Sequence, residues 1–516
     1  MKPAIVFIGF MGAGKSWSVA SVESLAGAAF DIDELIERRV GMSVREFFDS
    51  RDEAEFRRVE EEVASDLLAN ADGGAIALGG GTVLSPKVCS QLDRHTVVWL
   101  DVDAETAWGR VSKSDRPLVA RGRERFDALL DERRPIYERL ADVVLSTGDP
   151  DLVLRALPSI QALADFPSGT KLLWAASASG EYPIFVGPGL LGKIPWPLPG
   201  RRFCITDTAV EALYAADIEQ SGDQPVRRVP IGPGEESKTM SRAEDVLERL
   251  ARAGMTREDH VVALGGGVVG DLAGFCAHIY QRGVPVVHVP TTLVAQVDSA
   301  YGGKTGVNLS AGKNYAGAYQ LPAAVIADTS TLATLPHEEL AAGFVEVLKT
   351  GLLAGGELWE RTRSIETLDP VGLDDVVFAC ARYKCEVVAA DERDSGLRQV
   401  LNLGHTVGHA IEAVSRYEQY RHGEAVGLGL LAALRLSGAD SLRDEVEEML
   451  RRHGLPVTLG KSPAWGATDV VAALQRDKKR TAAGVGFVLL PEPGDPHTGE
   501  LVDPAKVEAA VEELLT

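Results

Sequence analysis

The 516 residues exceed what one hydrophobic core usually supports, and a content of 45% hydrophobic and 25% charged residues is typical of a soluble globular protein with several folding units. A net charge of -22 argues against non-specific binding to nucleic acid or to an anionic membrane. Five cysteines without a CxxC spacing, and no apolar run of about 18 residues, predict a cytoplasmic protein without disulfides or a transmembrane helix.

A short apolar run at residues 4–9 predicts a buried parallel strand, and it leads directly into the sequence GFMGAGKS. This sequence fits the GxxxxGK[ST] pattern, in which backbone N–H groups wrap around phosphates. Within it, Lys15 would neutralise phosphate oxygens and Ser16 would ligate magnesium. The pattern therefore predicts binding of ATP and Mg²⁺, with the loop residues Gly12, Ala13 and Gly14 around the phosphates.

Asp31 and Asp33 alternate on the next extended segment, where they could hold magnesium through water or deprotonate an acceptor hydroxyl. Such a pair can also simply cap a helix. Further along, a strand ends in three glycines at residues 79–81, which permits close approach of a small ligand. The arginine-rich residues 113–142 predict a cationic lid followed by a helix, although a solvated charged helix is the better interpretation of Arg125 and Arg134.

The segments GFMGAGKS, FDIDELIE, EFRRVEEEV, LGGGTV, RPL and ERRPIYERLAD together resemble shikimate kinase over residues 1–166. The resemblance implies ATP and magnesium at Lys15 and Ser16, a magnesium contact at Asp31, and phosphate contact by a closing Arg116. It also implies that shikimate is held by Asp33, Arg57, Gly80, Gly81 and Arg133, with Asp33, Lys15 and Arg116 acting in catalysis. One departure is Trp17, where the family usually has a small threonine.

A Pro-Ser-Gly connection at 167–169 predicts the boundary to a second α/β part. There a strand ends at Asp207, which could meet a nucleotide ribose or adenine. The sequence GGGVVGD at 265–271 follows another strand and opens a helix, an arrangement suited to a dinucleotide pyrophosphate. It is weaker than a strict GxGxxG fingerprint, and a tight turn without a ligand remains the alternative. Thr291 and Thr292 end a further strand and offer two hydroxyls.

From about residue 336 the pattern is helical, and three of the ten histidines fall within eighteen positions. His405 and His409 stand one helical turn apart, His422 follows, and Glu346 lies on another helix-like segment. Two imidazoles and one carboxylate are typical of a catalytic zinc site. A solvated helix face is the alternative for the i, i+4 histidine pair.

The segments GGGVVGDLAGF, VPTTLVAQVDSAYGGKTGVN, GKNYAGA, GFVEVLKTG and LNLGHTVGHAIE closely resemble 3-dehydroquinate synthase over residues 170–500. The resemblance implies that Glu346, His405 and His422 hold Zn²⁺ or Co²⁺, and that His409 is instead a substrate-side acid/base or phosphate partner. Around the substrate it implies Asp298, Lys304, Asn314, Lys349, Lys384, Arg398, Asn402, Arg282 and one of Lys478 or Lys479. Around NAD it implies Asp207, Glu235, Lys238, Gly266, Gly267, Val268, Asp271, Thr291, Thr292 and Lys313.

We therefore predict an α/β protein with a P-loop kinase domain (1–166), a Rossmann-like NAD-binding domain (170–336) and a mostly helical metal domain (337–516). The resemblances imply ATP-dependent phosphorylation of shikimate, and NAD- and metal-dependent conversion of 3-deoxy-D-arabino-heptulosonate 7-phosphate to 3-dehydroquinate and phosphate. They also imply a homodimer through the synthase part. The alternatives are a glycerol-dehydrogenase-type enzyme for the second part and a non-catalytic nucleotide sensor for the first.

Overall fold

The chain divides into two units in a computed structural model that describes residues 2–113, 119, 122–146, 149, 151–222, 224–310, 312–416, 418–460, 465–474 and 485–515. Unit 1 comprises Met1–Ala175 and Pro183–Phe185, and unit 2 comprises Ala176–Tyr182 and Val186–Thr516. The division falls among the residues of β6 (Lys171–Ser177) and β7 (Gly180–Gly187). The further division of the second part at 336/337 remains a prediction.

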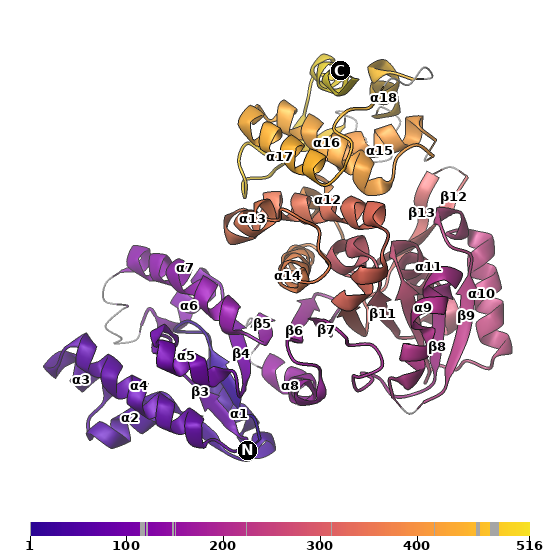
Figure 1. Ribbon diagram of the computed structural model, residues 1–516. Coiled ribbons are helices and arrows are strands. Elements are labelled where there is room, and N and C mark those ends of the chain that lie inside the picture. The colour runs from indigo at the N-terminus through magenta and orange to yellow at the C-terminus, as the bar shows by residue number, and fades with distance from the viewer. Residues whose placement is uncertain are drawn as a thin grey trace. The chain divides into compact units, whose positions relative to one another are not determined.

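Unit 1 is built on parallel strands in the order β2-β3-β1-β4-β5-β6. The strands are mostly buried apolar runs, as expected of a parallel sheet that helices cover. They are β1 (Ile5–Ile8), β2 (Ala29–Asp31), β3 (Ala75–Ala77), β4 (Thr96–Asp101), β5 (Val143–Ser146) and β6. The helices (Figure 1) are α1 (Lys15–Ala26), α2 (Ile32–Val40), α3 (Val44–Ser50), α4 (Glu53–Asn70), α5 (Pro86–Leu92), α6 (Ala104–Val111), α7 (Arg123–Leu140) and α8 (Leu152–Ala162).

In this sheet the phosphate-loop sequence follows β1, Asp31 ends β2, and the triple glycine follows β3. Because β1, β2 and β3 are parallel neighbours, their carboxyl ends share one edge of the sheet. The candidate residues of unit 1 are therefore gathered at that edge.

Within unit 2, parallel strands run in the order β14-β11-β10-β8-β9. These strands are β8 (Arg202–Asp207), β9 (Val226–Ile231), β10 (His260–Gly265), β11 (Val286–Pro290) and β14 (Ala324–Asp328). Between β11 and β14, the chain forms an antiparallel hairpin of β12 (Lys304–Leu309) and β13 (Gly312–Tyr319). The helices of this part are α9 (Thr208–Gln220), α10 (Met240–Arg252) and α11 (Gly267–Ile279).

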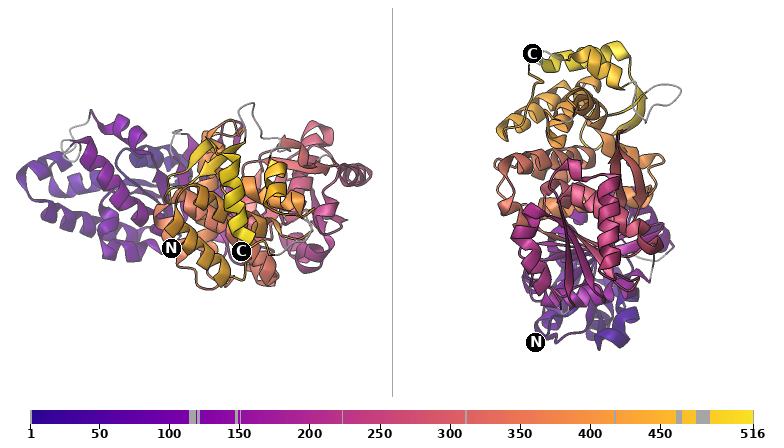
Figure 2. Two further views of the ribbon diagram at one scale, coloured as in Figure 1. Left: turned by 90° about the horizontal axis from the view of Figure 1, so that it is seen from above. Right: turned by 90° about the vertical axis from the view of Figure 1, so that its right-hand side faces the viewer.

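The rest of unit 2 is mostly helical and lies as a separate layer on the strand-bearing part, as two directions of view agree (Figures 1 and 2). Helices α12 and α16 are buried on nearly every side, as expected of helices that are apolar around most of their surface, and α12 also buries Glu346 and Lys349. The elements are α12 (His337–Ala354), α13 (Gly356–Arg363), α14 (Asp374–Ala390), α15 (His405–Val414), α16 (His422–Leu436), α17 (Asp440–Arg452), α18 (Ala467–Leu474), β15 (Gly486–Leu489), β16 (His497–Leu501) and α19 (Pro504–Glu512).

The predicted fold class is confirmed: both units are α/β, and a helical part follows the parallel strands of unit 2. Cys380 and Cys385 both lie on α14, and each is a buried free thiol. Within the described residues, every helix is too short or too polar to cross a lipid bilayer.

Candidate active sites

The phosphate loop of unit 1 is shaped by glycines and closed by a lysine. Gly14 precedes α1 with a φ of 96°, and among the described residues no side chain caps this helix, so its first N–H groups point outward as donors for an anion. Gly12 has a φ of 82°, and a Cβ there would lie 2.7 Å from the carbonyl oxygen of Ala107. Lys15 Nζ donates to the carbonyl oxygens of Gly9 (2.8 Å) and Phe10 (3.0 Å) across the loop.

Gly80 lies between the phosphate loop and Arg133, one of the arginines predicted to hold shikimate. Its carbonyl oxygen accepts hydrogen bonds from Arg133 (3.0 Å) and from the Tyr137 hydroxyl (2.6 Å). A Cβ at Gly80 would lie 3.6 Å from the backbone nitrogen of Met11, so the glycine turn borders the phosphate loop. Arg133 is 5% exposed, and its Nε has no hydrogen-bond partner among the described residues. A buried donor of this kind suits an anionic ligand.

Arg57 approaches the same turn from α4. A Cβ at Gly81 would lie 2.3 Å from Arg57 Nη1, so the guanidinium packs directly on this glycine and would have to move for any larger residue. Arg57 donates to Glu60 at 2.6 Å. Burial alone would lower the pKa of Arg57, but the carboxylates of Glu60 and Glu53 raise it. The structure thus brings Arg57, Gly80, Gly81 and Arg133 together beside the phosphate loop.

Two buried residues here were not predicted to have a role. The Glu60 carboxylate also accepts a hydrogen bond from Thr82 at 2.7 Å, so it orients both the arginine and the glycine turn. The i, i+3 spacing from Arg57 was the available sequence signal. Tyr137 is buried, which raises its pKa to about 12 and keeps its hydroxyl a donor.

The two aspartates expected on one extended segment lie on different elements: Asp31 ends β2, and Asp33 is in the first turn of α2. Asp31 caps α2, accepting a hydrogen bond from the N–H of Asp33 at 2.9 Å, so the helix-capping alternative describes Asp31 correctly. The carboxylate of a capping residue keeps further lone pairs for other contacts. Arg116, predicted to close over the phosphates, lies outside the described residues.

In unit 2, the glycine turn between β10 and α11 is packed against the end of β11. A Cβ at Gly266 would lie 2.9 Å from Thr292 Cγ2, and one at Gly267 would lie 3.1 Å from Ser299 Oγ. The N–H of Thr291 donates to the carbonyl oxygen of Gly265 at 3.1 Å. The predicted NAD residues Gly266, Gly267, Val268, Thr291 and Thr292 are therefore neighbours at one sheet edge.

Lys238 forms an ion pair with Asp271 in the first turns of α11. Its Nζ lies 2.7 Å from Asp271 and 3.5 Å from Glu235. Burial alone would lower the pKa of Lys238, but the Asp271 and Glu235 carboxylates raise it. Asp207 ends β8 and accepts hydrogen bonds from the N–H groups of Ala209 and Val210, both at 2.9 Å, so it also caps α9.

Three side chains from three helices of unit 2 converge as potential metal ligands. Oε1 of Glu346 on α12 lies 3.5 Å from Nε2 of His405 and 3.6 Å from Nε2 of His422. Ligand atoms of all three lie within 4.8 Å of one another. Glu346 is 1% exposed, and its oxygens accept no hydrogen bond from a described residue, although Lys349 Nζ lies 2.5 Å from Oε2 as an ion partner. This donor set fits a divalent metal ion such as Zn²⁺ or Co²⁺.

His405 is prepared as a neutral ligand. The carbonyl oxygen of Leu403 lies 3.1 Å from Nδ1, so Nδ1–H donates to it and the Nε2 lone pair faces Glu346. Burial, together with the positive charge of Lys349, holds the pKa of His405 well below its usual range. His409, one turn later, lies beside both rings, at centroid distances of 5.4 Å from His405 and 5.9 Å from His422. It forms a second group with Glu412 and His422.

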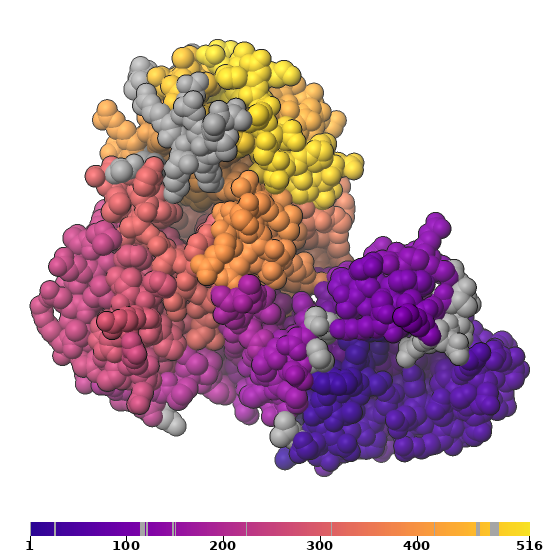
Figure 3. Space-filling view, turned by 180° about the vertical axis from the view of Figure 1, so that it is seen from behind, coloured from indigo at the N-terminus to yellow at the C-terminus, as the bar shows by residue number. Residues whose placement is uncertain are grey.

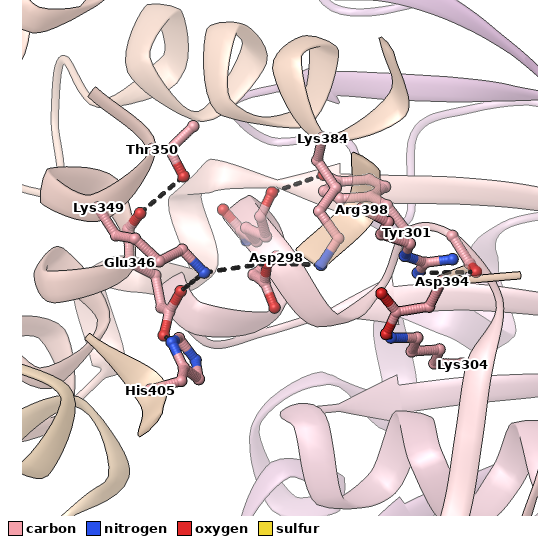
Figure 4. Close-up of polar contacts among 12 residues, drawn as sticks. Asp298, Tyr301, Lys304, Glu346, Lys349, Thr350, Lys384, Asp394, Arg398 and His405 are labelled. Atoms are coloured by element: carbon pink, nitrogen blue, oxygen red, sulfur yellow. Dashed lines mark hydrogen bonds and ion pairs between the residues drawn. The ribbon is translucent and has the colours of Figure 1, made fainter. Parts of the chain in front are cut away.

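A lysine-rich cluster borders the metal ligands (Figure 4). Asp298 lies on a π-helical turn, 2.5 Å from Lys384 Nζ and 3.8 Å from Lys349 Nζ. Burial opposes ionisation of Asp298, but the two lysines hold its pKa far below the usual value. Burial lowers the pKa of Lys384. Glu346 and Asp298 are thus connected through Lys349.

Other predicted substrate residues have mainly structural contacts in this conformation. Arg398 is buried and donates to the carbonyl oxygens of Glu392 (2.7 Å) and Gly302 (3.2 Å). Lys304 pairs with Asp394. Asn402 Nδ2 donates to the carbonyl oxygen of Gln399 at 3.1 Å.

Some predicted residues are not brought to the cluster. Arg282 is exposed, has a φ of 70°, and precedes β11, whereas Thr291 follows it. The five residues of β11 separate them by about 16 Å. Within one chain, Arg282 therefore lies at the amino ends of the parallel strands, and the glycine turn and Thr291 lie at the carboxyl ends. Asn314 is exposed with a φ of 56°. Lys478 and Lys479 lie outside the described residues.

A phosphate-loop kinase unit, followed by a unit with a dinucleotide-type glycine turn and a carboxylate–histidine metal centre, defines a fused two-site enzyme. Residues 11–157 match the family described as shikimate kinase. Residues 228–342 match 3-dehydroquinate synthase N-terminal, and residues 343–480 match 3-dehydroquinate synthase C-terminal. The chain belongs to the 3-dehydroquinate synthase family and carries a shikimate kinase domain before the synthase; its activities are those of these two enzymes of the shikimate pathway.

Two relatives match the synthase part of this chain over nearly their whole length. The 3-dehydroquinate synthase of Symbiobacterium thermophilum is 41% identical over 356 residues, which cover 65% of this chain and 98% of that relative. The 3-dehydroquinate synthase of Rhodococcus opacus is 43% identical over 349 residues, covering 64% of this chain and 92% of that relative.

Two solved structures of related synthases share the fold of this part. A 2-deoxy-scyllo-inosose synthase complexed with carbaglucose-6-phosphate, NAD⁺ and Co²⁺ is 26% identical with a TM-score of 0.59, covering 67% of this chain and 100% of that one. A 2-epi-5-epi-valiolone synthase from Streptomyces hygroscopicus with NAD⁺ and Zn²⁺ bound is 27% identical with a TM-score of 0.60, covering 64% of this chain and 96% of that one.

Proposed function

We propose that unit 1 binds ATP and Mg²⁺ at its phosphate loop and holds shikimate at the arginine-lined glycine turn beside it. The observation that carries this proposal is that Gly80 borders the loop while accepting hydrogen bonds from Arg133 and Tyr137. The guanidinium groups of Arg57 and Arg133 match the planar carboxylate of shikimate. An acceptor held here lies next to the phosphoryl group that is transferred.

In this arrangement Lys15 stabilises the charge of the transferring phosphoryl group, and Asp33 takes the proton of the attacking hydroxyl. Ser16 and Asp31 lie near the loop and β2 edge, where they would hold Mg²⁺ directly and through water. We keep Arg116 as the predicted closing residue.

The test uses the full-length chain and Lys15→Met. We expect shikimate-dependent ADP release from the wild type and its loss in the variant, because the lysine contacts the transferred phosphate. Synthase activity in the same preparation controls for folding. Absence of shikimate-dependent ADP release from the wild type would favour the nucleotide-sensor alternative.

For unit 2 we propose that NAD lies along the β10–α11 glycine turn and that Glu346, His405 and His422 hold Zn²⁺ or Co²⁺. Support comes from the convergence of these three side chains and from the NAD⁺ and metal named for the two related synthases. When bound, the metal supplies Lewis-acid polarisation of a substrate hydroxyl and NAD supplies a hydride acceptor.

The side chains around this centre then have distinct tasks. Lys349 and Lys384, with Asp298 between them, supply localised positive charge for the phosphorylated substrate in a chain whose net charge is -22. His409 lies one turn beyond His405 and acts as the substrate-side acid/base or phosphate partner. The remaining assigned contacts, Lys304, Arg398, Asn402, Asn314 and Arg282, stay as predictions.

The decisive assay supplies 3-deoxy-D-arabino-heptulosonate 7-phosphate and NAD, then follows phosphate and NADH together. We expect phosphate release without net NADH, because the hydride returns to the product within one turnover. Chelation should stop this reaction, and Zn²⁺ or Co²⁺ should restore it, while kinase activity measured with Mg²⁺ resupplied serves as the control. Net NADH from glycerol would instead support the dehydrogenase alternative.

We propose that the domain boundaries lie near 1–166, 170–336 and 337–516. We further propose that the chain forms a homodimer through the synthase part. Support for a self-contact is the apolar groove of about 470 Å³ between α10 and α11, where Met240 (46% exposed) and Ile279 (41%) face solvent. Sedimentation of the wild type and of the Met240→Glu/Ile279→Glu variant tests this: a dimer that dissociates in the variant supports it, and a monomeric wild type contradicts it.

A further inference from the structure

His422 presents its two ring nitrogens to two different carboxylates. Its Nε2 lies 3.6 Å from Glu346 Oε1, on the side of the potential metal ligands, and its Nδ1 lies 3.5 Å from Glu412 Oε2. Glu412 lies on α15, seven positions after His405, which begins that helix, whereas His422 begins α16. Glu412 has no part in the catalytic chemistry proposed for this site.

A neutral imidazole carries one N–H, and a carboxylate at one nitrogen decides where it resides. Both nitrogens of His422 face a carboxylate, so a metal ion held at Nε2 would leave the proton on Nδ1, where the Glu412 carboxylate accepts it. The same contact fixes the rotation of the ring. Carboxylates placed in this way behind ligating histidines commonly raise metal affinity.

Glu412 is itself held in place. It is 3% exposed, and its second oxygen, Oε1, lies 3.2 Å from Lys313 Nζ. Lys313 belongs to β13, and the β12–β13 hairpin rises from the strand-bearing part toward the helices of unit 2, where it forms the pink column in Figure 3. Each carboxylate oxygen thus has one partner, which makes a buried anion tolerable and sets its orientation.

We infer that Glu412 is a positioning residue for the metal, which fixes the tautomer and orientation of His422 while Lys313 anchors it from the hairpin. The inference rests on the proposed function, because it takes Glu346, His405 and His422 to be the metal ligands. The geometry also offers a competing role: Glu412, His409 and His422 form a group that could hold a second ion. Metal stoichiometry separates the two roles.

The experiment measures binding rather than turnover. The full-length chain is stripped of metal, and Zn²⁺ is titrated against a competing fluorescent chelator to obtain affinity and stoichiometry for the wild type and Glu412→Gln. We expect one Zn²⁺ per chain in both, with affinity about 10–100-fold weaker in the variant. Glu418→Gln removes the same charge from an exposed position before α16 and should match the wild type.

Co²⁺ absorption spectra provide a second readout, since a misoriented His422 changes the ligand field at unchanged stoichiometry. If Glu412→Gln does not fold, Lys313→Met carries the test, with a smaller loss of affinity in the same direction. Unchanged affinity in the folded variant overturns the inference. So does a wild type that binds two ions of which Glu412→Gln loses one. A wild type that binds no Zn²⁺ overturns the proposed metal site itself, a distinguishable failure.

Discussion

Gly429 of α16 lies directly against the carbonyl group of Gly404, the residue before α15: a Cβ at position 429 would lie 2.0 Å from Gly404 O. A second glycine of α16, Gly423, would place a Cβ 1.9 Å from the carbonyl oxygen of Ala342 in α12. No side chain fits at such distances. The helices that carry the three potential metal ligands are therefore in contact through their backbones, and the ligand geometry depends on glycines that touch no metal.

Substitution Gly429→Ala should therefore weaken metal binding without changing a ligand. We expect a loss of about 1–3 kcal/mol in the free energy of unfolding, because α16 must move away from α15. We also expect weaker Zn²⁺ binding, since His422 moves relative to His405. Gly427→Ala is the matched control on the same helix, because its Cβ would meet side-chain atoms and no backbone: Leu450 at 3.3 Å and Val345 at 3.6 Å. Equal thermal stability and Zn²⁺ affinity in both variants would contradict the prediction.

Arg57→Met should raise the KM for shikimate in the kinase reaction. Its guanidinium packs on Gly81 and pairs with Glu60, so the variant loses a carboxylate-binding group and leaves a buried glutamate without its cation. We expect a rise of about 10–100-fold, the size of a lost charged hydrogen bond. Arg58→Met on the exposed side of the same helix is the control and should change KM little. Equal KM values in the two variants would rule out this role for Arg57.

The stability of unit 2 should fall in mild acid because of His260. This residue is 1% exposed and its Nε2 accepts a hydrogen bond from the Trp196 indole N–H at 2.7 Å, so Nε2 carries no proton and the ring is neutral. Burial lowers the pKa of His260 to about 4. Protonation then favours the unfolded chain: the stabilisation is complete above the unfolded pKa of about 6.5 and is lost as the pH falls toward 4.

From the two pKa values, His260 should account for about 2 kcal/mol of the stability lost between pH 7.5 and pH 5. Denaturant unfolding of unit 2, followed at both pH values, should show that His260→Gln has a smaller pH dependence than the wild type. His497→Gln, at an exposed position, is the control. A pH dependence that is unchanged by His260→Gln would contradict the assignment.

The local motifs could be predicted because their chemistry depends on neighbours in sequence. The phosphate loop follows from eight consecutive residues, and the glycine turn at 265–271 follows from its place between strand and helix. Periodicity alone would have paired His405 with His409, and only the family resemblance replaced His409 with His422. The rings of His409 and His422 lie almost equally far from that of His405, at 5.4 and 5.3 Å, so sequence spacing alone could not have told the metal ligand from its neighbour.

Contacts between distant segments could not be predicted in this way. Lys313 and Glu412 are 99 positions apart, and Lys238 and Asp271 are 33 apart, so no local pattern links them. Such pairs are decided by which elements pack together. The same reason applies to Arg282: the family resemblance implied a substrate contact, and the direction of β11 places this residue at the amino end of the strand, away from Thr291 within one chain.

Trp17 should report on the nucleotide and limit its binding. It follows Ser16 in the first turn of α1, is 42% exposed, and stands where the phosphate-loop N–H groups point outward. A nucleotide whose phosphates lie on this helix end brings its α-phosphate and ribose near the indole. ATP should therefore change the tryptophan fluorescence of the wild type but not of Trp17→Phe. Trp17→Thr should lower the KM for ATP, because a small hydroxyl side chain leaves more space and can bind phosphate, while the KM for shikimate and the synthase rate stay unchanged. If ATP changes the fluorescence of Trp17→Phe as it does that of the wild type, and the KM for ATP is the same in Trp17→Thr, the indole lies away from the nucleotide.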